Sequence, residues 1–146
     1  MGRFFTLQEA EALIPKLREW LQQAIEAKQE AVEVEGELRA LSARINALGG
    51  AEIDPTAVAK RKLVRDQAVE RLQGAARHIE ASGALVKGLD TGLIDFPALL
   101  ENEEVYLCWK LGEPRIEYWH RIQDGFPGRK RIVDEFGQAS GSGKPN

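Results

Sequence analysis

The sequence predicts an α+β protein, in which a long, coiled-coil-like antiparallel αα-hairpin is capped by a small antiparallel β-sheet. Three observations predict this fold class. Apolar residues follow one another at alternating steps of four and three from Leu13 to Leu48, the spacing of a helix that faces a partner helix along its length. A second helical stretch of opposite net charge follows after a short glycine-containing loop. Beyond Gly83 the apolar period changes to two, which is typical of strands.

The first helix is expected over about residues 7–48. Thr6 and Glu9 form a capping box, since the Thr6 hydroxyl can accept from a backbone amide while Glu9 reaches back to the Thr6 amide. The apolar positions that follow define a seam on one face of the helix, and the 3.5-residue spacing directs this face toward a partner helix. The seam begins with Leu13, Leu17, Trp20, Ala24, Ala27, Ala31 and Val34.

The second helix is expected over about residues 55–82, because Asp54 followed by Pro55 is typical of an N-cap and a first helical residue. Residues 7–48 carry five basic and eight acidic side chains, whereas residues 55–82 carry six basic and three acidic ones. Opposite net charges favour antiparallel pairing of the two helices. At ~1.5 Å per residue the first helix is about 20 Å longer, so its first residues should pack against whatever follows Gly83.

A β-hairpin is predicted from two aromatic and β-branched runs, 104–111 and 115–122, around Gly112–Pro114. With a three-residue loop, positions that sum to 226 face each other, which pairs Tyr106 with His120. The first face then holds Tyr106, Cys108, Lys110, Ile116, Tyr118 and His120. The second face holds Val105, Leu107, Trp109, Leu111, Glu117, Trp119 and Arg121. The second face is the more apolar one and is expected to be the core.

Two shorter strands are expected before this hairpin, over 84–87 and 93–96, on either side of a turn. Asp90 and Asp95 bracket that turn beside the candidate hairpin face, and a turn-stabilising role explains them at least as well as metal ligation or carboxylate catalysis. Pro97 is expected to open a helical turn after the second strand. The sequence therefore divides into a helical hairpin (1–83), a β cap packed on the N-terminal end of the first helix (84–136) and a flexible, Gly/Ser-rich tail (137–146).

Composition excludes several classes of protein. The 146-residue chain has a net charge of −3, so no overall positive field attracts nucleic acid. No apolar stretch approaches the ~20 residues of a membrane span, and we expect a cytoplasmic protein. A single cysteine cannot form an intramolecular disulfide, and one cysteine with two histidines falls short of a closed four-ligand zinc site unless carboxylates or a second chain contribute ligands. No metal site is assigned, no cofactor is indicated, and no common catalytic motif is present.

Several motifs resemble one known family. They are Phe5–Leu7 with Leu13–Pro15, Leu85–Lys87 with Gly92–Ala98, Glu104–Trp109 with Leu111–Pro114, Trp119–His120, and Gly125–Phe126. The chain is similar in these segments to DUF2203, a family of small bacterial and archaeal proteins of unknown function. The resemblance covers residues 5 to about 132. It implies that these segments form one small intracellular protein, and it implies no reaction, cofactor or partner.

Two functions remain open. The first is a non-catalytic interaction protein, in which the shorter second helix leaves part of the seam uncovered for a second copy or a partner helix. The alternative is a small-ligand or metal-binding protein, hydrolytic if it is an enzyme, that uses the polar and aromatic face of the 104–122 hairpin. Its candidate ligand-binding residues are Tyr106, Cys108, Tyr118, His120, Asp124 and Arg129. The sequence favours the first function, and therefore a homodimer or a protein partner.

Overall fold

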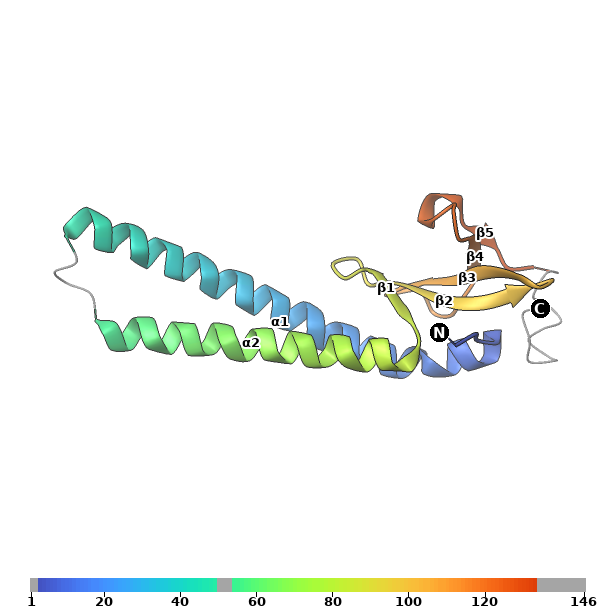
Figure 1. Cartoon of the computed structure of the whole chain (residues 1–146), viewed down its shortest axis with the longest axis horizontal. Coiled ribbons are helices and arrows are strands. Elements are labelled where there is room, and N and C mark those ends of the chain that lie inside the picture. Colours follow the sequence, from blue (N-terminus) through green and yellow to red (C-terminus); the bar gives the residue numbers. More distant parts are fainter. Residues whose placement is uncertain (1–2, 50–53, 134–146) are drawn as a thin grey trace. The chain divides into compact units, whose positions relative to one another are not determined.

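The computed structural model describes residues 3–49 and 54–133. Its elements in chain order are α1 (Leu7–Leu48), α2 (Pro55–Ser82), β1 (Leu85–Gly88), β2 (Leu93–Leu100), β3 (Glu103–Lys110), β4 (Tyr118–Arg121), the 3₁₀ helix η1 (Phe126–Gly128) and β5 (Lys130–Arg131) (Figure 1). The predicted α+β class, with two packed helices and an antiparallel sheet, is confirmed. The predicted tail at 137–146 lies outside the described residues.

The chain forms two compact units that do not follow chain order. Of the described residues, unit 1 contains 3–21 and 77–133, so it combines the first turns of α1, the last turn of α2 and the whole sheet. Unit 2 contains residues 22–76, the remaining parts of the two helices. The described helices include none long and apolar enough to cross a membrane.

Both helices begin with the caps that the sequence predicts. The Thr6 amide donates to Glu9 Oε1 and the Glu9 amide donates to Thr6 Oγ1, each at 3.0 Å, which completes the capping box. Asp54 Oδ1 accepts from the Thr56 amide at 3.0 Å. These bonds satisfy backbone amides that a helix start otherwise leaves without a partner.

In unit 2, α1 and α2 lie side by side and antiparallel (Figure 1). Small side chains lie at this contact, since Ala24, Ala27, Ala68 and Ala75 are all buried. Ion pairs join the helices across this contact, in agreement with their opposite net charges: Arg61 with Glu37 at 3.3 Å, Arg65 with Glu35 at 3.1 Å, and Arg71 with Glu30.

The seam is not the free surface that the sequence suggested. Leu17, Ala24, Ala27, Ala31 and Val34 are at most 9% exposed. Leu13 and Trp20, which also belong to the seam, are partly buried against the core of unit 1. The expectation of an exposed seam is therefore wrong for these residues, because the chain covers them itself.

The sheet in unit 1 has the order β1-β2-β3-β4-β5, and every neighbouring pair is antiparallel. Leu107 pairs with Trp119, as the predicted register requires. The face carrying these two side chains packs into a core that also contains the first turns of α1. The largest buried side chains of this core are Trp109, Phe5, Phe96, Leu17, Leu21, Ile79, Ile94 and Leu107.

β2 is longer than predicted and runs through Pro97, so the expected helical turn there is wrong. Pro97 pairs with Tyr106 of β3, and its carbonyl accepts from the Phe5 amide at 2.7 Å on the opposite side. Since the nitrogen and carbonyl of one strand residue point the same way, the missing proline donor faces away from β3. No bond of the β2–β3 ladder is lost.

The fourth strand is shorter than predicted, because residues 111–117 form a loop. Glu113 organises this loop, with its carbonyl accepting from Trp109 Nε1 and its carboxylate accepting from the Lys110 amide, both at 3.0 Å. Ile116 consequently leaves the face assigned to it and is buried in the core. Its amide donates to Glu11 Oε2 at 3.2 Å.

Candidate functional site

Three ionisable side chains meet on the sheet face opposite the core. Asp95 and His120 are the only buried polar or charged residues in the described part of the chain, at 3% and 2% exposure. Cys108 lies between their strands and is fully buried. Asp95 on β2 pairs with Cys108 on β3, and His120 on β4 follows Cys108's partner Tyr118 by two residues. Strand alternation therefore directs all three side chains to one face.

The imidazole of His120 is held at both nitrogens. Nδ1 lies 2.8 Å from the Arg121 carbonyl oxygen, which can only accept, so Nδ1 carries a proton. Nε2 lies 3.1 and 3.2 Å from the two carboxylate oxygens of Asp95. One potential ligand atom from each of Asp95, Cys108 and His120 lies within 4.8 Å of the others. Nε2 and the carboxylate can share a proton or bind a cation together.

Burial controls the protonation of the other two groups. It raises the pKa of the Asp95 carboxyl, while His120 and Lys87 act in the opposite direction. Burial also raises the pKa of the Cys108 thiol to about 12, with the Asp95 charge adding to the effect and Arg129 opposing it. Cys108 is therefore a neutral thiol at pH 7 and a poor nucleophile by itself.

Aromatic and cationic side chains surround this cluster. The Tyr106 ring meets the His120 ring edge to face, with centroids 5.6 Å apart, and Lys87 Nζ lies 4.8 Å from the Tyr106 centroid. On the other side, Arg129 Nη1 lies 3.7 Å from Cys108 Sγ. The guanidinium carbon of Arg129 is 4.0 Å from the Tyr118 centroid. These contacts shield the cluster from solvent.

The structure brings together five of the six predicted ligand-binding residues: Tyr106, Cys108, Tyr118, His120 and Arg129. Asp124 is exposed in the turn after β4 and does not belong to the Asp95–Cys108–His120 group. Its side chain instead lies against Gly128.

Asp95 is not among the predicted ligand-binding residues, because the sequence favoured a turn-stabilising role for it; it lies inside β2 and not at a turn. The available signal was the apolar run on both sides of Asp95, which continues to Leu100. The end of this strand is hard to locate in the sequence, because the β2–β3 turn, Glu101–Asn102, has positive φ at both residues (51° and 67°) but no glycine. Such turns usually carry glycine, so this one is hard to recognise in a sequence.

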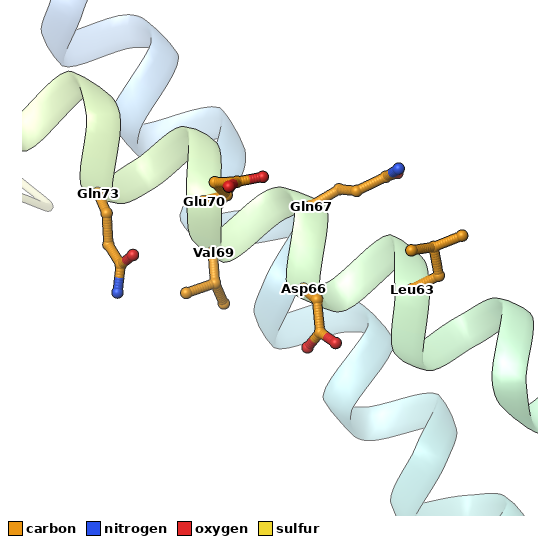
Figure 2. A pocket seen from close by; sticks show the side chains of 6 residues that line it. All are labelled: Leu63, Asp66, Gln67, Val69, Glu70 and Gln73. Atoms are coloured by element: carbon orange, nitrogen blue, oxygen red, sulfur yellow. The ribbon is translucent and has the colours of Figure 1, made fainter.

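A second surface feature lies on α2 in unit 2. Figure 2 shows the six side chains that line a pocket there: Leu63, Asp66, Gln67, Val69, Glu70 and Gln73. The carboxylates of Asp66 and Glu70 are on exposed residues, and the lining includes no histidine or cysteine. Among the residues that the structure describes, the group that could hold a metal ion is the sheet cluster of Asp95, Cys108 and His120.

Comparison with protein-family models gives a match. The family model DUF2203, described as "Uncharacterized conserved protein", matches residues 3–132 of the chain. The chain therefore belongs to this family. No curated protein matches it significantly, and no solved structure does.

Proposed function

We propose that this DUF2203 protein binds a divalent transition metal of the zinc class through Asp95, Cys108 and His120. The observation that carries the proposal is the convergence of a carboxylate, a thiol and an imidazole in a buried cluster within 4.8 Å. Oxygen, sulfur and nitrogen ligands together suit the borderline-soft Zn²⁺ ion. A bound cation would also displace the thiol proton and favour the thiolate.

The second contact of His120 supports the same function. A histidine that binds a metal usually donates its other ring N–H to a backbone carbonyl or carboxylate, which fixes the ring and its tautomer. Nδ1 makes such a contact with the Arg121 carbonyl at 2.8 Å, and Nε2 is left facing the Asp95 carboxylate. A metal bound here would compete with any proton shared between Nε2 and the carboxylate.

Burial disfavours a hydrolytic role for this centre, although three protein ligands leave the fourth position of a tetrahedral zinc ion unfilled. Asp95, Cys108 and His120 are each at most 3% exposed, whereas a catalytic metal needs a coordination position open to water or substrate. The ligands come from three adjacent strands, so a bound ion would join β2, β3 and β4. A structural or metal-sensing role follows from this arrangement.

Metal titration tests the function. Chelator-treated protein is expected to bind one equivalent of Zn²⁺ or Co²⁺ by calorimetry, and the Co²⁺ form should show a thiolate-to-cobalt charge-transfer band. At a free-metal concentration of about 1,000 Kd, binding should stabilise the fold by roughly 4 kcal/mol. If the protein binds no metal, or if the Co²⁺ form lacks the thiolate band, Asp95 and His120 are only a structural ion pair.

Self-association is a second candidate function, and a different observation favours it. In unit 2, residues 22–37 and 66–76 carry seven acidic and two basic side chains, whereas 38–49 and 54–65 carry six basic and one acidic. The hairpin is thus acidic at one end and basic at the other. Val32 and Leu63 also expose 59% and 57% of their surface. Two copies packed antiparallel would oppose unlike charges along their whole length.

Charge reversal tests self-association. Lys60 and Lys62 are exposed, and neither forms an ion pair with another described residue. The double variant Lys60→Glu/Lys62→Glu is expected to weaken dimerisation at least about tenfold, and high salt should have the same effect. Sedimentation velocity measures both. The control Lys16→Glu/Arg77→Glu makes the same charge change in unit 1 and should leave the dimer intact; a monomer at all concentrations would contradict the proposal.

A further inference from the structure

We infer that Arg129 is a positioning residue of the metal centre, where it donates an N–H to the sulfur of Cys108 and keeps this sulfur in the ligand set. This inference rests on the proposed metal-binding function. Arg129 Nη1 lies 3.7 Å from Cys108 Sγ, and a guanidinium can only donate hydrogen bonds. The sulfur is therefore the acceptor.

A tight turn brings Arg129 to this position. Gly125 has φ of 69°, a conformation that glycine adopts readily. A Cβ atom at Gly128 would lie 2.7 Å from Asp124 Cβ, so only glycine fits there. The 3₁₀ turn η1 ends when the Arg129 amide bonds to the Phe126 carbonyl at 3.1 Å, and Arg129 itself is extended. The backbone is thus shaped to present this one side chain.

The guanidinium is then fixed from three sides. Arg129 Nη2 lies 2.7 Å from Glu113 Oε2, and the two side chains are only 16% and 19% exposed. The guanidinium carbon lies 4.0 Å from the Tyr118 centroid and 4.2 Å from the Phe126 centroid. A planar cation between two aromatic faces and a carboxylate has little freedom to turn away from Cys108.

Glu113 is itself held in place. Its Oε1 accepts from the Lys110 amide, and its carbonyl accepts from Trp109 Nε1, both at 3.0 Å. Trp109 is fully buried in the core of unit 1. A chain of contacts therefore runs from the core through Glu113 and Arg129 to the sulfur. Outer contacts of this kind orient metal ligands and tune their affinity.

Charge balance shows why an arginine suits this position. A divalent ion with the thiolate of Cys108, the carboxylate of Asp95 and a neutral imidazole has no net charge. The charges of Arg129 and Glu113 also neutralise each other. An N–H of Arg129 can therefore donate to the Cys108 thiolate without leaving an uncompensated buried charge. A thiol is a weak acceptor, whereas a thiolate makes the stronger, charge-assisted hydrogen bond. The contact therefore favours the metal-bound form of Cys108.

The test compares two arginines that both contact Tyr118. Arg129→Gln is expected to lower Co²⁺ and Zn²⁺ affinity roughly 10- to 100-fold. It should also move the thiolate-to-cobalt band to longer wavelength, because a hydrogen bond to sulfur stabilises the electrons that this transition excites. Arg131 bonds to the Tyr118 hydroxyl at 3.4 Å and has no contact with Cys108 in the described structure. Arg131→Gln should therefore leave affinity and band unchanged.

A second variant, Glu113→Gln, tests the role of Arg129 in case Arg129→Gln does not fold. Glu113→Gln retains the guanidinium and removes its ionic partner, so it should shift affinity and band in the same direction by a smaller amount. Normal Co²⁺ binding with an unmoved band in folded Arg129→Gln would overturn the role of Arg129 and leave metal binding intact. If Arg129→Gln does not fold, an unmoved band in Glu113→Gln overturns that role. If the unchanged chain binds no Co²⁺, metal binding and the role of Arg129 fail together.

Discussion

His120→Ala is expected to lower the affinity for Zn²⁺ or Co²⁺ roughly 100- to 1,000-fold. A small zinc site contributes about 10–16 kcal/mol in total, so one of three ligand side chains accounts for several kcal/mol, and each 1.4 kcal/mol is tenfold. Calorimetric titration of chelator-treated protein measures the loss. The same variant leaves the Asp95 carboxylate buried without its imidazole partner, which by itself destabilises a fold. Circular dichroism must therefore show that the variant is folded.

Two further variants separate metal binding from folding. Asp95→Asn keeps the size of the side chain and a polar contact to His120 while removing the charged ligand, so it should lose affinity with a smaller cost in stability. His78→Ala removes the other histidine of the chain, which is exposed and stacks on Trp20 at 5.4 Å. His78→Ala should bind metal normally. Equal affinity in all three variants would rule out the Asp95–Cys108–His120 centre.

The sequence predicted those parts of the fold that local chemistry determines. The Thr6–Glu9 capping box and the Asp54 cap depend on residues three and two positions apart, and both form as expected. The register of β3 and β4 was also predictable, because one alternating face is far more apolar than the other. Pro97 was misread because its tolerance depends on which side of β2 meets a neighbour, and that is a tertiary property.

The site was predictable only in part, for the same reason. Cys108 and His120 lie on one hairpin, so their common face follows from strand alternation. Asp95 joins them through the β2–β3 register, which an inconspicuous turn sets. The burial of the polar face could not be read from alternation either, since it depends on Arg129 folding back over Cys108. A polar face in a sequence is ordinarily assigned to solvent.

Trp109→Ala is expected to lower the free energy of unfolding by about 3–5 kcal/mol, the range for removing a large aromatic side chain from a core. Trp109 is fully buried, and its Nε1 donates to the Glu113 carbonyl at 3.0 Å. Urea unfolding measures the change, provided that the slope with denaturant is unchanged. Trp20→Ala is the matched control: Trp20 is only partly buried, so the loss should be clearly smaller. Equal losses would show that Trp109 does not have this place in the core.

Trp109→Phe separates packing from the hydrogen bond to Glu113. Phenylalanine keeps most of the buried ring but has no N–H, so the Glu113 carbonyl loses its donor and stability should fall by only about 1–2 kcal/mol. Because Glu113 holds Arg129 at 2.7 Å, this small loss should be accompanied by weaker Co²⁺ binding and a shifted thiolate band. A change in stability with no change in the metal centre would mean that the 111–117 loop keeps its shape without this bond. A change in both would trace the position of Arg129 back to a side chain in the core.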